Sequence, residues 1–183
     1  MAIVRDQDNR NRAGMLRWGL IPVWAKDISI GYKMINARSE TVHEKPAYKR
    51  LLKRRRCLIP ASGFYEWKKN GSEKQPHHIQ LKSEEPFAFA GLWDRWESED
   101  GPVQSCTILT TQPNELMADI HNRMPVILTK DTEDAWLDRT NEDPEYLRSL
   151  LQPHEAGEMK AYEVSRAVGS PKNQGSDLID PVS

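Results

Sequence analysis

The chain has 183 residues, of which 38% are hydrophobic and 29% charged, with a formal net charge of −1 and a mean hydropathy of −0.73. This length fits a single domain with an adequate core over residues 1–183. A membrane helix and an ordinary secretory signal are excluded, because no apolar run approaches ~20 residues and the first ten residues turn polar after four.

Strand-like runs separated by polar turns dominate the chain. In order, they cover residues 2–6, 14–21, 33–40, 56–69, 76–83, 87–96, 103–111 and 159–165. The first two are joined by the polar turn QDNRNR. The pair Asn70-Gly71 predicts a tight hairpin, because both residues tolerate a positive φ. Residues 166–183 are expected to form a closing loop.

Helices are predicted to be few and short. Residues 46–55 place apolar side chains on one helical stripe and basic ones opposite. A short helix is expected over 113–119, another after a cap at Asp131, and a third that Asp143 caps and that ends near Pro153. Hairpin-ordered strands with few helices predict an α+β fold around a mixed, strongly curved, barrel-like sheet with short peripheral helices.

Glu66 is an isolated carboxylate in the aromatic stretch GFYEW. Strand alternation places Tyr65 and Trp67 on the face opposite to it. One interpretation is an edge-strand glutamate that reaches water or pairs with an arginine. The other is a general acid or base whose pKa is raised by apolar surroundings. The strand alone favours the first.

Two further polar clusters lie next to apolar residues. In DIHNRMP, His121 suits proton transfer near neutrality and Arg123 offers a planar fork of donors for phosphate. A histidine favoured by a helix C-terminus is the alternative. In MINARSE, Asn36 and Arg38 fall on one face of a short strand, with Ala37 opposite.

The charge is unevenly distributed. Residues 1–60 hold 14 Lys/Arg against 5 Asp/Glu, whereas residues 61–183 hold 12 against 22. Lys49 and Arg50 begin a run of eight residues that contains six basic ones. With Trp18, Trp24 and Trp67, such a run suits single-stranded nucleic acid, because cations meet phosphates and rings stack on bases. The alternatives are a solvated helix face, halves that neutralise each other in the fold, and tryptophans that are mostly core.

No metal and no cofactor are expected. His77 and His78 are adjacent on a strand and point to opposite faces, so they cannot easily share an ion. No P-loop, GxSxG or HExxH motif occurs. Cys57 and Cys106 lie far apart in apolar strands and are expected to be reduced core residues of a cytoplasmic protein.

Several motifs in register resemble one family over nearly the whole chain, from about Leu16 to Val182. They are LRWGLIPVWAKD, INARSE, CLIPASGFYEW, DIHNRMPVIL and VSRAVGSPKNQG. Together they resemble the SOS response-associated peptidase (SRAP) family of abasic-site processing proteins. The resemblance implies that the protein is associated with the nucleoid and binds single-stranded DNA containing abasic sites. It also implies that the protein acts as a monomer. Family members capture such sites covalently as a thiazolidine on an N-terminal cysteine, and the peptidase in the name reflects N-terminal self-processing.

The resemblance also implies roles for individual residues. Glu66 and His121 would move protons during sugar ring opening and imine formation, and Asn36 would orient the nucleophile. The flanking phosphates would be held by the motif arginines, and the lesion would be contacted by two tryptophans. With the basic helix added, the expected DNA-binding residues are Trp24, Arg38, Lys49, Arg50, Trp67 and Arg123.

The sequence departs from the family at its start. The family pattern begins Met-Cys-Gly-Arg, whereas this chain begins Met1-Ala2, so the N-terminal segment with the catalytic cysteine is apparently missing. Neither Cys57 nor Cys106 replaces it, because a thiazolidine needs amine and thiol on one residue. Either this is a truncated form or a mis-started reading frame of an active protein, or it is a natural short paralogue that has lost the nucleophile. The leading hypothesis is therefore an abasic-site crosslinking enzyme, and the alternatives are a non-catalytic single-stranded DNA-binding module and a self-processing protease.

Overall fold

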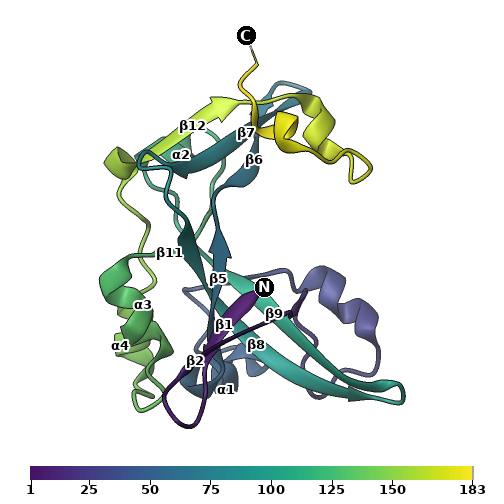
Figure 1. Cartoon of the computed structure of the whole chain (residues 1–183), viewed down its shortest axis with the longest axis vertical. Coiled ribbons are helices and arrows are strands. Elements are labelled where there is room, and N and C mark those ends of the chain that lie inside the picture. Colours follow the sequence, from purple (N-terminus) through teal and green to yellow (C-terminus); the bar gives the residue numbers. More distant parts are fainter. Residues whose placement is uncertain (183) are drawn as a thin grey trace.

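The computed structural model of the protein describes residues 1–182 as an α+β fold with two β-sheets (Figure 1). The larger sheet contains β1 (Ala2–Arg5), β2 (Asn11–Gly14), β3 (Arg17–Trp18), β4 (Asn36–Arg38), β5 (Arg56–Ala61), β8 (Phe87–Ser98), β9 (Gly101–Thr111), β10 (Met124–Pro125) and β11 (Ile127–Leu128). The smaller sheet contains β6 (Phe64–Asn70), β7 (Glu73–Leu81) and β12 (Met159–Glu163).

The helices are short, as predicted. The α-helices are α1 (Pro46–Arg54), α2 (Glu115–Ala118), α3 (Lys130–Leu137) and α4 (Pro144–Ser149). The 3₁₀ helices are η1 (Ile28–Lys33), η2 (Ala156–Glu158), η3 (Arg166–Gly169) and η4 (Ser176–Ile179). Within the described residues, no helix is long and apolar enough to span a membrane.

The larger sheet is mixed but open. Its strands follow the order β10-β9-β8-β5-β1-β2, with β11 on β8, and β3 and β4 both parallel to β9. Among residues 1–182, β10 and β2 are the two ends of this path and do not pair with each other. The mixed sheet is therefore confirmed, whereas the barrel-like closure predicted from the sequence is not.

The strand predicted over residues 56–69 divides into two, because the chain changes sheets within it. β5 pairs with β1 and β8 in the larger sheet, whereas β6 pairs with β7 in the smaller one. The break falls at Ser62-Gly63, where a side chain on Gly63 would collide with the His78 ring and lie 2.9 Å from the Ile79 carbonyl oxygen. Only glycine permits this close approach. Glu66 is consequently carried into the smaller sheet.

The predicted β6–β7 hairpin is confirmed. Asn70 pairs with Glu73, so the two-residue loop is Gly71-Ser72, and Gly71 has a φ of +61°. Asn70 itself stays in the strand, so the positive φ belongs to the glycine alone. Within β7, Pro76 has no N–H to donate to β12, and the side chain of Gln75 donates instead to the Val164 carbonyl at 3.0 Å.

Other boundaries differ from the prediction at turns and caps. The strand predicted over residues 14–21 is mostly wrong, because only Gly14, at the end of β2, and the two residues of β3 lie in strands. β2 begins inside the predicted turn, so that Asn11 pairs with Arg5. Thr129, rather than Asp131, caps α3 through reciprocal hydrogen bonds with Thr132. The cap at Asp143 is confirmed, since its carboxylate accepts from the Glu145 N–H at 3.0 Å. The closing loop contains η3 and η4.

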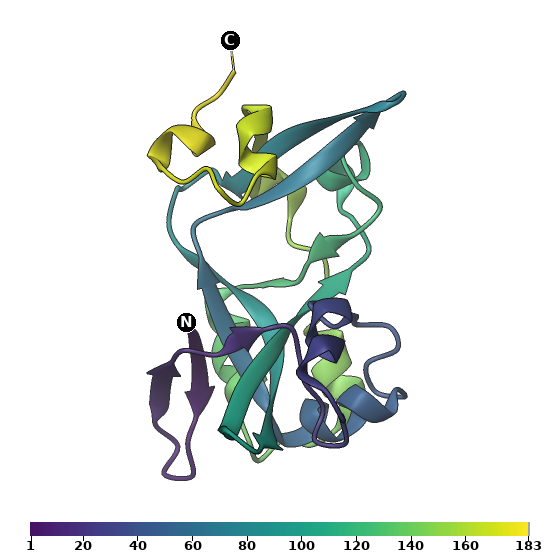
Figure 2. The same ribbon diagram turned by 90° about the vertical axis from the view of Figure 1, so that its right-hand side faces the viewer.

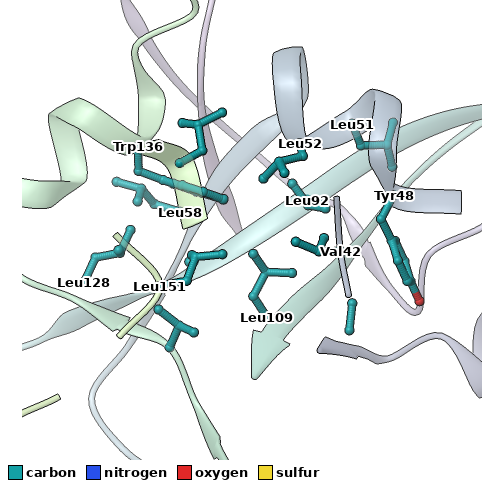
Figure 3. Packing of buried hydrophobic residues seen from close by; sticks show 14 of the residues in the cluster. Val42, Tyr48, Leu51, Leu52, Leu58, Leu92, Leu109, Leu128, Trp136 and Leu151 are labelled. Atoms are coloured by element: carbon teal, nitrogen blue, oxygen red, sulfur yellow. The ribbon is translucent and has the colours of Figure 1, made fainter. Parts of the chain in front are cut away.

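The main hydrophobic core lies between α1, α3, α4 and the larger sheet (Figure 3). From α1 it receives Tyr48, Leu51 and Leu52, the apolar stripe predicted from the sequence. Trp136 of α3 is fully buried, and its indole N–H donates to the Cys57 carbonyl at 3.1 Å. Each buried leucine contributes roughly 2 kcal/mol. This packing holds α1 at one end of the long axis, whereas β6 and β7 lie at the other (Figures 1 and 2).

Candidate active site and DNA-binding surface

Glu66 lies on β6, an edge strand of the smaller sheet. Its side chain is 25% exposed. Burial raises the pKa of this carboxyl above its ordinary value, while His121 and the Trp67 N–H act in the opposite direction. A carboxyl group with a raised pKa can exchange protons closer to neutrality than an ordinary glutamate. The environment thus fits the acid–base interpretation rather than a carboxylate paired with arginine.

His121 meets Glu66 from a different part of the chain. It follows α2, whose N-terminus is capped by Asn114, and its backbone N–H donates to the Met117 carbonyl at 2.8 Å. The His121 Nδ1 lies 3.8 Å from Glu66 Oε1. This distance is too long for a direct hydrogen bond, so an atom of a bound substrate would have to connect the two groups.

The His121 ring has two backbone partners at the same nitrogen. Nδ1 accepts from the Arg123 N–H at 3.2 Å, and the Arg123 carbonyl oxygen lies 3.1 Å from it. A neutral ring with its proton on Nε2 uses the first contact, and a ring that carries a proton on Nδ1 donates it to the Arg123 carbonyl. The loop therefore accommodates both protonation states of His121.

Arg123 is held by the protein itself. Its Nη1 and Nη2 donate to the two carboxylate oxygens of Glu40 at 2.6 and 3.0 Å, and Nη2 also donates to the Thr110 carbonyl at 2.6 Å. The Arg123 side chain is only 16% exposed, and its hydrogen bond lowers the pKa of Glu40. The prediction that Arg123 holds a phosphate would require a phosphate to join or displace Glu40, and it stays a prediction.

Asn36 and Arg38 share the exposed face of β4, while Ala37 between them is buried, as the alternation predicted. β4 runs parallel to β9 and places Arg38 beside Thr110, the residue that also holds Arg123. The positive charge of Arg38 contributes to lowering the pKa of Glu40. The structure therefore places Arg38 next to the Glu40–Arg123 pair, with Asn36 two residues further back along β4.

Three of the six tryptophans are exposed. Trp24 is 58% exposed and Trp67 37%, so both predicted contact residues reach solvent. Trp18 is 57% exposed, and its indole N–H donates to the Ile35 carbonyl, next to Asn36. Trp18 therefore belongs to the candidate surface. From the sequence it is one of the aromatic residues suited to nucleic acid, but it is not among the expected DNA-binding residues. Because β3 has only two residues, periodicity gave no signal for the exposed side.

Lys49 and Arg50 are not brought to Glu66. They lie on α1, at the opposite end of the molecule from β6 (Figures 1 and 2). Lys49 is exposed, and the Arg50 guanidinium lies 3.0 Å from the carboxylate of the buried Asp94. Their predicted DNA contact is untested and would require a second surface.

The cleft around Glu66 also contains two lysines that the sequence reasoning did not select. It has a volume of about 290 Å³ and is lined by Glu66, Trp67, Lys69, Lys74 and His121. Lys69 and Lys74 come from the two strands of the hairpin. No direct signal in the sequence indicated this pair, because a turn at Asn70-Gly71 would place Lys69 opposite Ser72, whereas the observed Gly71-Ser72 loop places Lys69 opposite Lys74.

Both cysteines and His78 are buried and do not line this cleft. Cys57 and Cys106 are buried, which confirms the core prediction, and burial raises the pKa of the Cys106 thiol to about 11 and that of Cys57 well above its ordinary value. His78 is buried with its Nδ1 2.9 Å from the Tyr162 hydroxyl. Among residues 1–182, no group of three or more His, Cys, Asp or Glu is placed to hold a metal ion.

Comparisons with known proteins give a consistent result. The family model described as SOS response associated peptidase (SRAP) matches residues 1–171. Abasic site processing protein YoqW of Bacillus subtilis is 57% identical over 182 residues, covering 98% of this chain and 81% of that protein. Abasic site processing protein HMCES of Gallus gallus is 33% identical, covering 98% and 61%. A crystal structure of a Bacteroides thetaiotaomicron protein has a TM-score of 0.87 at 30% identity, covering 99% of this chain and 80% of that one.

Proposed function

The chain belongs to the SOS response associated peptidase family, and from this premise we propose that it processes abasic sites in single-stranded DNA at the cleft beside β6. The observation that carries the proposal is the meeting of Glu66 and His121 at an open cleft, with Trp67 beside them. These are the residue types that proton transfer on a sugar and contact with an adjoining base require.

The proposed chemistry begins with the closed sugar of the abasic site. Glu66, as carboxylate, takes the proton of the anomeric hydroxyl, and protonated His121 returns a proton to the ring oxygen as the carbon–oxygen bond breaks. The product is the open aldehyde. An amine then adds to the aldehyde carbon, and a proton from the acid–base pair allows water to leave as the imine forms. Attack of a thiolate on the imine carbon closes a thiazolidine, so that the whole reaction releases one water.

In this reaction, the present chain supplies the residues for the proton transfers. The first two residues are Met1 and Ala2, so the N-terminal cysteine of the family's covalent step is not among these 183 residues. Both cysteines that are present are buried, and burial keeps their thiols protonated at neutral pH. In the proposal, Asn36 orients the nucleophile, and Arg38 and Trp24 hold the strand.

The proposal is tested by adding free cysteine to the chain and an oligonucleotide with one abasic site. Cysteine carries both amine and thiol, so the chain should accelerate thiazolidine formation, measured by mass shift of the DNA. Glu66→Gln should reduce this acceleration by roughly 100-fold, since it removes the proton acceptor. Glu99→Gln, on an exposed turn, is the matched control and should have no effect.

Binding and chemistry are separated by a second variant. Arg38→Ala should weaken retention of the oligonucleotide on a native gel, whereas Glu66→Gln should leave it unchanged, because Arg38 is assigned to the phosphates. Equal losses of retention in both variants would contradict these roles. Retention by the wild-type chain without any acceleration would instead support the non-catalytic binding module, and absence of retention would overturn the DNA-binding proposal.

A further inference from the structure

Lys69 and Lys74 face each other directly across the β6–β7 hairpin. The Pro76 carbonyl accepts from the Val164 N–H, so residue 76 points its backbone groups toward β12. Because backbone direction alternates along a strand, residues 75 and 77 then point toward β6. The pair of lysines therefore occupies a non-hydrogen-bonded position of the ladder, where facing side chains lie closest.

This arrangement has a cost. Like charges directly opposite each other on an antiparallel pair are destabilising. Both lysines are exposed, and within the described part of the chain neither forms an ion pair or a side-chain hydrogen bond. By contrast, Lys160 of β12 is paired with Glu84, and Arg166 of the neighbouring η3 with Glu73. An anion between the two lysines would remove the repulsion.

The lysine pair is also placed next to the candidate site. Trp67 and Lys69 share one face of β6, and Glu66 lies on the other, so the cleft wraps around the free edge of this strand. Three residues along a strand span about 10 Å, which separates Lys69 from Glu66. Trp67 lies between them in the sequence. A DNA strand with its abasic sugar at Glu66 would therefore bring a neighbouring phosphate to the lysines.

We propose that Lys69 and Lys74 together bind one backbone phosphate of the DNA strand beside the abasic nucleotide, with Trp67 between that phosphate and the lesion. This inference rests on the proposed function and adds a strand-positioning subsite to it. Two ammonium groups on adjacent strands converge on one anion, and their mutual repulsion in the free protein is relieved on binding. The hairpin thereby fixes which nucleotide reaches Glu66.

The first test uses Lys74→Glu, which converts the facing pair into Lys69 opposite a carboxylate. An opposite-charge pair stabilises a hairpin, so the melting temperature should stay the same or rise. Affinity for an abasic oligonucleotide should fall by roughly tenfold, because a cation has been replaced by an anion. A binding loss together with a lower melting temperature would assign Lys74 to folding rather than to DNA, and unchanged affinity would overturn the subsite.

The second test maps the phosphate. Replacing single phosphates around the lesion by neutral methylphosphonates should weaken wild-type binding most at one position on one side. In the double variant Lys69→Gln/Lys74→Gln, a methylphosphonate at that position should no longer weaken binding, while the effects at the other positions stay the same. The slope of log affinity against log salt should become shallower than that of the wild type by about 0.7. Lys82→Gln/Lys130→Gln, two exposed lysines outside the cleft, is the control and should keep the wild-type profile.

The outcomes separate this inference from the proposed function. If the wild type binds the abasic oligonucleotide and the double variant at positions 69 and 74 shows the same methylphosphonate profile and salt slope, the subsite is wrong while the proposed function stands. If the wild type does not bind, both are wrong.

Discussion

Two basic regions of this molecule invite comparison: the run from Lys49 to Arg56 and the hairpin of β6 and β7. The run is far denser in charge, with six basic residues in eight. Most of its arginines nevertheless have carboxylate partners within the protein. Arg54 pairs with Glu142, and both Arg50 and Arg55 approach the buried Asp94. The hairpin has fewer cations, but those facing the cleft at Glu66 are unpaired within residues 1–182.

Arg56 shows how a basic residue can be entirely structural. It is 4% exposed, and its guanidinium donates to the backbone carbonyls of Leu52 and Lys53 at the end of α1 and of Trp136 and Asp138 around the end of α3. Burial lowers its pKa to about 10. Density of charge in a sequence therefore indicates a polyanion surface only where the cations lack internal partners.

The largest expected effect is on folding, at Arg56. Arg56→Ala leaves several buried carbonyls without donors and should lower the free energy of unfolding by about 3 kcal/mol or more. Arg54→Ala removes only an exposed ion pair and should cost less than about 1 kcal/mol. Urea unfolding of both variants measures the contrast. A loss of similar size in the two variants would contradict the structural role assigned to the buried hydrogen bonds of Arg56.

A smaller effect is expected at Glu66, with a defined pH dependence. Its pKa is raised by burial, so its contribution to stability is complete below the ordinary value of 4.5 and is lost as the pH rises through the value in the folded protein. Glu66→Gln removes that loss and should melt at a higher temperature than wild type at pH 7, with the gain disappearing near pH 4. Thermal melts at the two pH values measure this. A gain that is the same at both would exclude the raised pKa as its cause.

The smallest expected effect is on DNA binding by the basic helix. Lys49→Gln/Arg50→Gln should change affinity for an abasic oligonucleotide by less than about twofold, because α1 lies at the end of the molecule away from the cleft. Fluorescence anisotropy of labelled DNA provides the measurement, with Lys69→Gln/Lys74→Gln as the contrasting variant. A larger loss in the helix variant would restore the surface predicted from the sequence.

The sequence was most informative where a local rule decides the structure. The stripe of Tyr48, Leu51 and Leu52 predicted α1, and alternation correctly placed Asn36 and Arg38 on one exposed face. Family motifs identified Glu66 and His121, which the fold brings to 3.8 Å of each other across 55 residues of sequence. Neither residue alone would have been distinguished from an ordinary surface side chain.

What the sequence could not predict depends on contacts made at a distance. At the change of sheet, the His78 ring, which comes from a different strand, leaves room only for a glycine at position 63. The pairing of Arg123 with Glu40 joins two loops, and the pairing of the basic helix with Asp94 joins α1 to β8. The last two contacts give Arg123 and Arg50 carboxylate partners within the protein that no local pattern of the sequence indicated. The DNA contacts expected near Glu66 and along α1 stay predictions.

The most direct measurement is amide hydrogen exchange with and without an oligonucleotide that carries one abasic site. β6 is an edge strand, so its outward backbone N–H groups exchange readily until something covers them. Slower exchange over residues 64–76 and 119–123, with residues 46–54 unchanged, is the predicted result. Protection confined to residues 46–54 would contradict the placement of the site at the Glu66 cleft.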